Sequence, residues 1–254
     1  MIDYFDLTGK TAVITGGNRG LGLGISKALV AYGANVAVVS TKTNPGVEIE
    51  LRAAGAEGIK VRSYEFDLGD FDAYDGLVAQ VISDFGEIDI LVNNAGVQRR
   101  SPAVDFSVAD WDFVVDIDMK APFLLCQKVG KQMLARGNGK IINIASLLSF
   151  QGGLTVPAYA AAKHGVSGFT KALSNEWAAK GININAIAPG YMSTEMNEAL
   201  LQDKVRSEQI LSRIPAGRWG NPDDIAGTAV FLSSAASDYI NGFTIAVDGG
   251  WLGR

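Results

Sequence analysis

The chain has 254 residues, of which 48% are apolar and 19% are charged, and its formal net charge is −5. The acid excess and the lack of a basic stripe argue against nucleic acid as a partner, and no apolar run reaches the ~18 residues that span a membrane. The single cysteine, Cys126, has no partner for an internal disulfide, and the acidic N-terminus lacks the apolar core of a signal peptide. We therefore expect a cytoplasmic protein.

Short β-rich runs alternate with helical patterns along the whole chain. Strands are predicted at residues 11–15, 35–40, 59–66, 88–96, 139–146, 181–190 and 242–250. Apolar residues at helical spacing lie between them, and the longest predicted helices cover about 108–133 and 157–179. This alternation predicts one α/β domain over residues 1–254, a Rossmann-like, doubly wound parallel sheet with helices on both faces. The polar segment at about 192–220 is interpreted as a substrate lid; the alternative is an ordinary pair of surface helices.

A glycine-rich turn directly follows the first predicted strand. Gly16, Gly20 and Gly22 allow the backbone to turn tightly, and the N-terminus of the next helix points at the same place. The N–H groups and the dipole at such a helix terminus attract anions. The spacing differs from the common G-x-G-x-x-G pattern, but the position between a strand and a helix indicates a pyrophosphate site.

The residues beside this turn bear on the choice between NADP and NAD. Many NAD-binding folds place an acidic residue about 20 residues farther on, where it binds the ribose 2′-hydroxyl. Here the second strand ends in Ser40, Thr41 and Lys42, and the first acid after it is Glu48. Because Arg19 adds a cation within the turn, we favour NADP over NAD. The alternative is that Arg19 and Lys42 are solvated surface charges.

A serine and a Tyr-x-x-x-Lys pair form a candidate proton-transfer site. If Pro157 begins a helix, Tyr159 and Lys163 share one face of it. The ammonium then favours the phenolate and lowers the tyrosine pKa. Ser146, at the end of a predicted strand, can bind the oxygen on which the tyrosine acts. Such a group moves a proton on or off an alcohol or carbonyl oxygen; taken alone, the pair is also compatible with an ordinary surface helix.

Taken in order, these motifs resemble the short-chain dehydrogenase/reductase family. The pattern reads Thr15-Gly16-x-x-x-Gly20-x-Gly22, Asn93-Asn94-Ala95-Gly96, Ser146, Tyr159-x-x-x-Lys163 and Pro189-Gly190, and the resemblance covers essentially the whole chain. It implies that Tyr159 is the general acid in ketone reduction and the base in alcohol oxidation. It further implies that Ser146 binds the substrate oxygen and that Lys163 holds the nicotinamide ribose.

The resemblance and the turn together define an expected cofactor site. Its residues are Gly16, Asn18, Arg19, Gly20, Leu21, Gly22, Ser40, Thr41, Lys42, Asp67, Leu68, Asn94, Ala95, Gly96, Tyr159, Lys163, Pro189, Gly190, Met192 and Thr194. The resemblance also implies a homotetramer that is formed through the two long helices. No cluster of histidine and cysteine predicts a metal site, and the only histidine, His164, lies on a different helix face from Tyr159.

One position departs from the family pattern. Members usually carry an asparagine in the middle of the long fourth helical segment, where it completes a proton relay through water to the lysine. Here that position is Asp118. An aspartate can accept the same water hydrogen bond, but its charge raises the tyrosine pKa. We include Asp118 with Ser146, Tyr159 and Lys163 as a catalytic residue; the alternative is a solvated aspartate without influence.

Longer stretches such as NNAGVQRR and SSAASDYINGFTIAVDGGWL resemble a subgroup that interconverts the alcohol and ketone of sugar acids. Implied substrates are 2-dehydro-3-deoxy-D-gluconate and 2-deoxy-D-gluconate, and the subgroup is generally NAD-linked, which opposes the argument from Arg19. Arginine can bind such a carboxylate through two hydrogen bonds. Candidates for substrate contacts are Ser146, Tyr159, Gln151, Arg99 and Arg100, and three further arginines, Arg206, Arg213 and Arg218, lie in or near the lid.

Two other functions remain as alternatives to a sugar-acid dehydrogenase. One is a general ketoreductase for β-keto thioesters or small ketones, and the other is a catalytically silent nucleotide sensor.

Overall fold

The computed structural model describes residues 3–254 and contains one seven-stranded sheet. The strand order is β3-β2-β1-β4-β5-β6-β7, and every neighbouring pair is parallel. The strands are β1 (Thr11–Thr15), β2 (Asn35–Ser40), β3 (Val61–Glu65), β4 (Ile90–Asn93), β5 (Gly139–Ile144), β6 (Ile182–Pro189) and β7 (Thr244–Val247). All seven predicted strands are present. Several end earlier than predicted because the residues after them leave the sheet to form the site.

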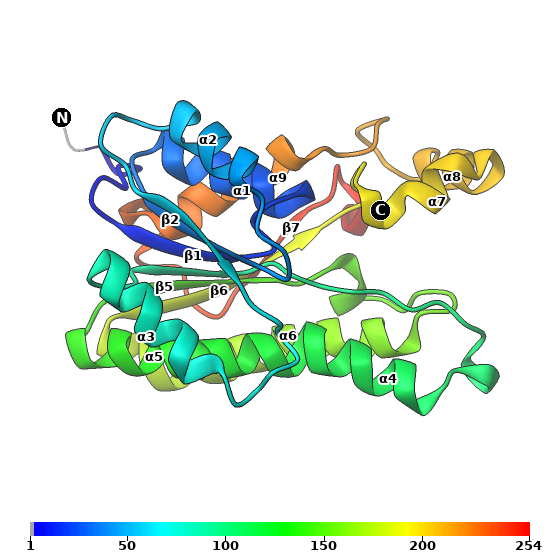
Figure 1. The fold of residues 1–254 in the computed structure, drawn as a ribbon. Coiled ribbons are helices and arrows are strands. Elements are labelled where there is room, and N and C mark those ends of the chain that lie inside the picture. The colour runs from blue at the N-terminus through cyan, green and yellow to red at the C-terminus, as the bar shows by residue number, and fades with distance from the viewer. Residues whose placement is uncertain (1–2) are drawn as a thin grey trace.

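Helices cover both faces of the sheet (Figure 1). One face carries α1 (Gly20–Ala31), α2 (Pro45–Ala54) and α9 (Pro222–Ser233). The other carries α3 (Tyr74–Phe85), α4 (Val108–Val115), α5 (Ala121–Arg136) and α6 (Pro157–Trp177). The short helices α7 (Glu198–Gln202) and α8 (Lys204–Leu211) lie beyond the end of β6. The predicted doubly wound architecture is confirmed. Among residues 3–254, none of the helices has the length and apolar character that spanning a membrane requires.

The hydrophobic core has two layers, one on each side of the sheet. All five residues of β1 are buried: Ile14 packs among residues of α1 and α9, and Val13 packs on the opposite face among residues of α3 and α5. Strands that are buried on both faces consist of continuous apolar residues rather than of alternating ones. This explains the continuous apolar residues of Ala12–Ile14 in β1 and of Ile90–Val92 in β4.

The helix predicted over 108–133 contains an irregularity that apolar spacing did not predict. α4 continues through a π-helical turn, η2 (Asp116–Lys120), into α5. Such turns are rare and are frequently found at functional sites. This one contains Asp118, whose side chain is fully buried. The irregular turn therefore lies where the sequence departs from the family pattern.

The strand order places the site. The sheet reverses its winding between β1 and β4, and ligands of open α/β sheets bind in the crevice beyond the carboxyl ends of the strands at such a point. The glycine-rich turn follows β1, and the Asn94–Gly96 segment follows β4. The topology thus brings the two motifs to the same edge of the sheet.

Candidate active site

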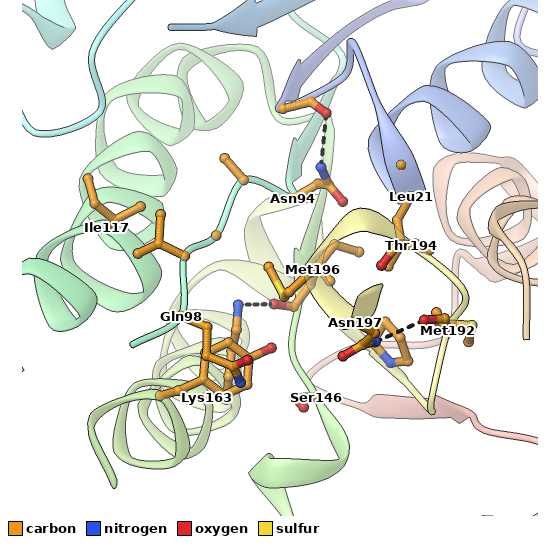
Figure 2. A pocket seen from close by; sticks show the side chains of 18 of the residues that line it. Leu21, Asn94, Gln98, Ile117, Ser146, Lys163, Met192, Thr194, Met196 and Asn197 are labelled. Atoms are coloured by element: carbon orange, nitrogen blue, oxygen red, sulfur yellow. Dashed lines mark hydrogen bonds between the residues drawn. The ribbon is translucent and has the colours of Figure 1, made fainter. Parts of the chain in front are cut away.

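A cavity of about 1230 Å³ lies beyond the carboxyl ends of the strands (Figure 2). It exceeds the ~300–1,000 Å³ that is common for a site of one small molecule. All the predicted cofactor, substrate and catalytic residues line it except Gly22 and Asp118. Gly22 lies behind the wall, where a Cβ would overlap the carbonyl oxygen of Gly16. A dinucleotide and a small substrate together suit a cavity of this size.

The glycine-rich turn leaves the start of α1 open to an anion. Arg19 is the N-cap residue, no side chain caps the helix, and its first turn contains no acid. Gly16 and Gly20 have φ angles of +64° and +52°, a region that favours glycine. The unpaired N–H groups and the helix dipole fit a diphosphate at this point.

Asn94 holds the turn against β4. Its amide nitrogen donates to the carbonyl oxygen of Thr15 at 2.9 Å and to that of Gly16 at 3.3 Å; the second bond is drawn in Figure 2. The Thr15 hydroxyl in turn accepts from the backbone N–H groups of Asn94 and Ala95, both at 3.0 Å. The predicted ligand-binding segment after β4 therefore also fixes the shape of the phosphate turn.

The corner formed by Arg19 and the end of β2 lacks a carboxylate from β2 or from the residues directly after it. Glu48 is held away, because it accepts from the backbone N–H of Ser63 at 2.7 Å and pairs with Arg52 at 2.8 Å. Arg19 is not a free cation, however, since its guanidinium pairs with Glu195 at 2.8 Å. Both of these side chains are well exposed. This pair could not be predicted from local patterns, because it joins residues 176 positions apart.

Lys163 is buried at the centre of the proton-transfer group. Pro157 begins α6, as predicted, and places Tyr159 and Lys163 in the cavity wall. The Lys163 ammonium donates to the carbonyl oxygen of Ile144 at 2.9 Å (Figure 2) and lies 5.5 Å from the centre of the Tyr159 ring. The Ser149 hydroxyl donates to the Lys163 carbonyl oxygen at 2.6 Å. This bond ties α6 to the short turn η3 (Leu147–Ser149), for which Ser146 is the N-cap residue.

Asp118 lies 3.6 Å from the Lys163 ammonium, and their side chains are 0% and 4% exposed. One carboxylate oxygen accepts from the backbone N–H of Val97 at 2.7 Å. The other has no hydrogen-bond partner among residues 3–254. Asp118 is therefore a buried neighbour of Lys163 rather than a solvated surface acid, and its free oxygen suits a water molecule in a polar pocket.

The pKa of Tyr159 reflects opposing influences. Loss of hydration raises it most, and the negative charge of Asp118 raises it further. The charges of Lys163 and Arg100 and the hydroxyl of Ser146 lower it. Burial likewise raises the pKa of Asp118, while Lys163 and the N–H of Val97 lower it. The direction in which Asp118 shifts the pKa of Tyr159, upward, is the one expected from the sequence.

The segment 192–220 covers one side of the cavity. The 3₁₀ turn η5 (Glu195–Asn197) precedes α7 and α8, and the base of the segment is closed by a bridge between Met192 and Gly220. The amide of Asn197 also donates to the carbonyl oxygen of Met192 at 2.9 Å (Figure 2). Ile210 and Ile214 anchor the far end in an apolar cluster with Leu147 and Trp251.

Glu195 and Trp251 also line the cavity, although neither was predicted. Glu195 follows the predicted Thr194 and could have been found from that position. Trp251 comes from the C-terminal turn η7 (Trp251–Gly253), and its place depends on the complete fold. His164 lies outside the cavity and bonds to the carbonyl oxygen of Ala160. Within residues 3–254, no three acidic, histidine or cysteine side chains are grouped as a metal site.

Comparison with known proteins agrees with this geometry. The family model described as short chain dehydrogenase matches residues 10–205. The chain is 50% identical to 2-dehydro-3-deoxy-D-gluconate 5-dehydrogenase of Bacillus subtilis (strain 168), over 99% of this chain and 98% of that protein. It is 42% identical to gluconate 5-dehydrogenase of Gluconobacter oxydans (strain 621H), over 98% and 96% of the two chains.

Two solved structures extend the comparison. The first, from Agrobacterium tumefaciens and provisionally described as a 2-deoxy-D-gluconate 3-dehydrogenase, contains NADP; it is 51% identical with a TM-score of 0.92 and full coverage of both chains. The second, a gluconate 5-dehydrogenase from Burkholderia cenocepacia J2315 in complex with NADP and tartrate, is 39% identical with a TM-score of 0.93, over 99% and 98% of the chains. Together with the matched family model, these similarities establish that the chain belongs to the short-chain dehydrogenase family and is an oxidoreductase.

Proposed function

We propose that this enzyme transfers a hydride between the nicotinamide of NADP and a secondary alcohol or ketone of a sugar acid, with 2-dehydro-3-deoxy-D-gluconate and 2-deoxy-D-gluconate as the leading substrates. The observation that carries the proposal is the buried Lys163 ammonium beside Tyr159, at the wall of a cavity that also contains the open N-terminus of α1. The alternative cofactor is NAD.

In this proposal the side chains of the protein carry out the proton transfer of the reaction. The Tyr159 hydroxyl gives a proton to the carbonyl oxygen during reduction, and the phenolate takes it back during alcohol oxidation. Ser146 binds the same oxygen, and Lys163 stabilises the phenolate through its charge. Asp118 accepts a hydrogen bond from water beside Lys163, which lets protons reach the site from solvent. The bound nicotinamide supplies or accepts the hydride, and the protein contributes position and charge.

Several features support NADP as the preferred cofactor. The corner near Arg19 and Lys42 contains no carboxylate from β2 that would bind a free ribose 2′-hydroxyl. A guanidinium binds a phosphate through two hydrogen bonds. Both solved relatives described above contain NADP. In this proposal Arg19 exchanges its partner Glu195 for the 2′-phosphate when the cofactor binds.

The sugar-acid assignment is supported by the relatives and by the charge in the cavity. The curated relatives described above act on 2-dehydro-3-deoxy-D-gluconate and on gluconate, and one solved relative holds the dicarboxylate tartrate. Arg100 lines the cavity together with Tyr159 and Gln151. Arg99 also lines it, but its guanidinium pairs with Asp110 at 3.2 Å and lies over the ring of Phe113. Arg100 is therefore the better of the two predicted carboxylate contacts.

Two further parts of the proposal concern motion and assembly. The segment 192–220 acts as a lid, since Thr194, Met196 and Leu200 line the cavity from one side. The chain forms a homotetramer through the face of α4, α5 and α6, where the large apolar side chains of Trp111 and Phe123 are exposed. A cytoplasmic location agrees with Cys126, which is free and buried.

A turnover screen at 340 nm tests the proposed function. The purified protein is assayed with 2-dehydro-3-deoxy-D-gluconate, 2-deoxy-D-gluconate, gluconate, acetoacetyl thioesters and small ketones, each with NADP(H) and NAD(H). We expect kcat/KM for a sugar acid to exceed that for the other classes at least about tenfold, because a charge-assisted hydrogen bond contributes about 1.5–3 kcal/mol. A preference for thioesters would favour the general ketoreductase, and cofactor binding without turnover would favour the sensor.

The Asp118→Asn enzyme tests the electrostatics of the proton-transfer group. Asp118 raises the pKa of Tyr159, so removing its charge stabilises the phenolate. Alcohol oxidation requires the phenolate, and its rate therefore increases at lower pH in the variant than in the parent enzyme. The pH–rate profiles of both are compared with that of Asp116→Asn, a partly exposed acid in the same π-helical turn that pairs with Lys120. A profile unchanged by Asp118→Asn would contradict this account.

The Glu195→Gln enzyme tests the cofactor assignment. Losing the carboxylate frees Arg19 and removes a negative charge near the proposed 2′-phosphate site. Because exposed ion pairs contribute about 0.2–1 kcal/mol, we expect the KM for NADPH to fall by up to about fivefold, with that for NADH little changed. Glu198→Gln, which alters an acid outside the cavity, is the control. Equal changes for both cofactors would argue against a 2′-phosphate at Arg19.

A further inference from the structure

Besides Arg19 at the glycine-rich turn, five arginines lie in or near the cavity, and three of these five already have partners. Arg99 pairs with Asp110. Arg213 lies over the ring of Trp251, with its guanidinium carbon 4.1 Å from the ring centre. Arg218 pairs with Asp224 through two hydrogen bonds of 2.6 and 2.7 Å. Neither Arg213 nor Arg218 lines the cavity. These contacts occupy three of the five candidates for binding a substrate carboxylate.

The other two, Arg100 and Arg206, have no acidic partner. Within residues 3–254, no carboxylate oxygen lies within 4.0 Å of either guanidinium. Both line the same cavity as Ser146 and Tyr159. Arg100 comes from the loop after β4, whereas Arg206 belongs to α8 in the lid segment. The two elements thus contribute one unpaired cation each to the substrate end of the cavity.

Arg100 and Arg206 bring two positive charges to the lining of one cavity. Burial lowers the pKa of Arg100 most, and the positive charge of Arg206 lowers it further. Two like charges that share a partly dehydrated space favour an anion between them. Residues 3–254 supply no carboxylate that pairs with either side chain. Arg100 and Arg206 together therefore suit a negatively charged group of a ligand.

The packing of α8 directs Arg206 toward the site. Residues four apart share one face of a helix, and Ile210, four residues after Arg206, is buried against the cluster that contains Leu147. Leu147 directly follows Ser146. Asp203 caps the start of α8 by accepting from the backbone N–H of Arg206 at 3.1 Å, which leaves the guanidinium uninvolved. The helix is therefore held in register with the catalytic serine.

We propose that Arg206 binds the substrate carboxylate together with Arg100 and makes the lid specific for acids. This inference rests on the proposed function, and it assigns recognition of the acid group to a residue of the lid. Each arginine can form a bidentate pair with a carboxylate. Because one arginine belongs to the body and the other to the lid, a bound carboxylate links the two parts. A neutral polyol of the same length lacks this link.

The test compares two substrates that differ only at the acid group. Oxidation of 2-deoxy-D-gluconate and of 2-deoxy-D-glucitol, in which a hydroxymethyl group replaces the carboxylate, is measured with NADP⁺. In Arg206→Gln we expect the KM for the acid to increase about 10- to 100-fold, since charge-assisted hydrogen bonds contribute about 1.5–3 kcal/mol, while kcat and the polyol kinetics change little. Arg206→Lys should retain part of the affinity. Lys204→Gln, which removes a lysine on the same helix outside the cavity, should leave both unchanged.

A binding measurement keeps the inference separate from the proposed function. Tartrate is titrated calorimetrically into the NADP⁺-loaded parent enzyme and into the Arg206→Gln enzyme. We expect a loss of affinity of at least tenfold in the variant. If the parent enzyme oxidises no sugar acid but tartrate binding still requires Arg206, the proposed substrate is wrong and the carboxylate site stands. An acid KM and a tartrate affinity that are both independent of Arg206, or equal losses for the acid and the polyol, would overturn the inference.

Discussion

The site depends on one buried cation. The Lys163 ammonium is 4% exposed and is held by the carbonyl oxygen of Ile144, with the carboxylate of Asp118 at 3.6 Å. Burial of an ammonium costs free energy unless polar groups replace its water, and here the end of β5 and the π-helical turn supply them. Burial raises the pKa of Tyr159 and the charge of Asp118 raises it further, while the Lys163 cation acts in the opposite direction and lowers it. The Lys163 cation therefore influences both where the Tyr159 phenol lies and how readily it releases its proton.

The fold explains how distant residues meet around that cation. Parallel strands have their carboxyl ends on one edge, so the turns after β1, β4, β5 and β6 line one cavity. Asn94 secures the phosphate turn to β4, and Ser149 secures η3 to α6. The glycine-rich turn and the turn that follows Ser146 therefore belong to the same edge of the sheet. The segment 192–220 contributes to the cavity at several points: Glu195 pairs with Arg19, and Arg206 lines the same cavity as Arg100.

Much of this could be predicted from the sequence because the signals are local or ordered along the chain. Short β-rich runs predicted the strands, and the four-residue spacing of Tyr159 and Lys163 predicted that both lie on one face of α6, where they line the cavity. The π-helical turn around Asp118 could not be predicted, since periodicity alone does not separate it from a regular helix. The sequence also could not show which of the five candidate arginines is free to bind a substrate carboxylate. Ion pairs such as that of Arg99 with Asp110 form only when separate segments pack. Long-range contacts decide which charges remain free.

The most direct test of the account is the pKa of the Tyr159 phenol, measured by carbon-13 NMR of ring-labelled tyrosine in the NADP⁺ complex. The resonance is assigned by its loss in Tyr159→Phe, and the titration is repeated in Lys163→Met. The account predicts that Tyr159 titrates at a higher pH in Lys163→Met than in the parent enzyme, because the variant lacks the ammonium that stabilises the phenolate. An equal or lower pKa in Lys163→Met would contradict the claim that this cation controls the proton.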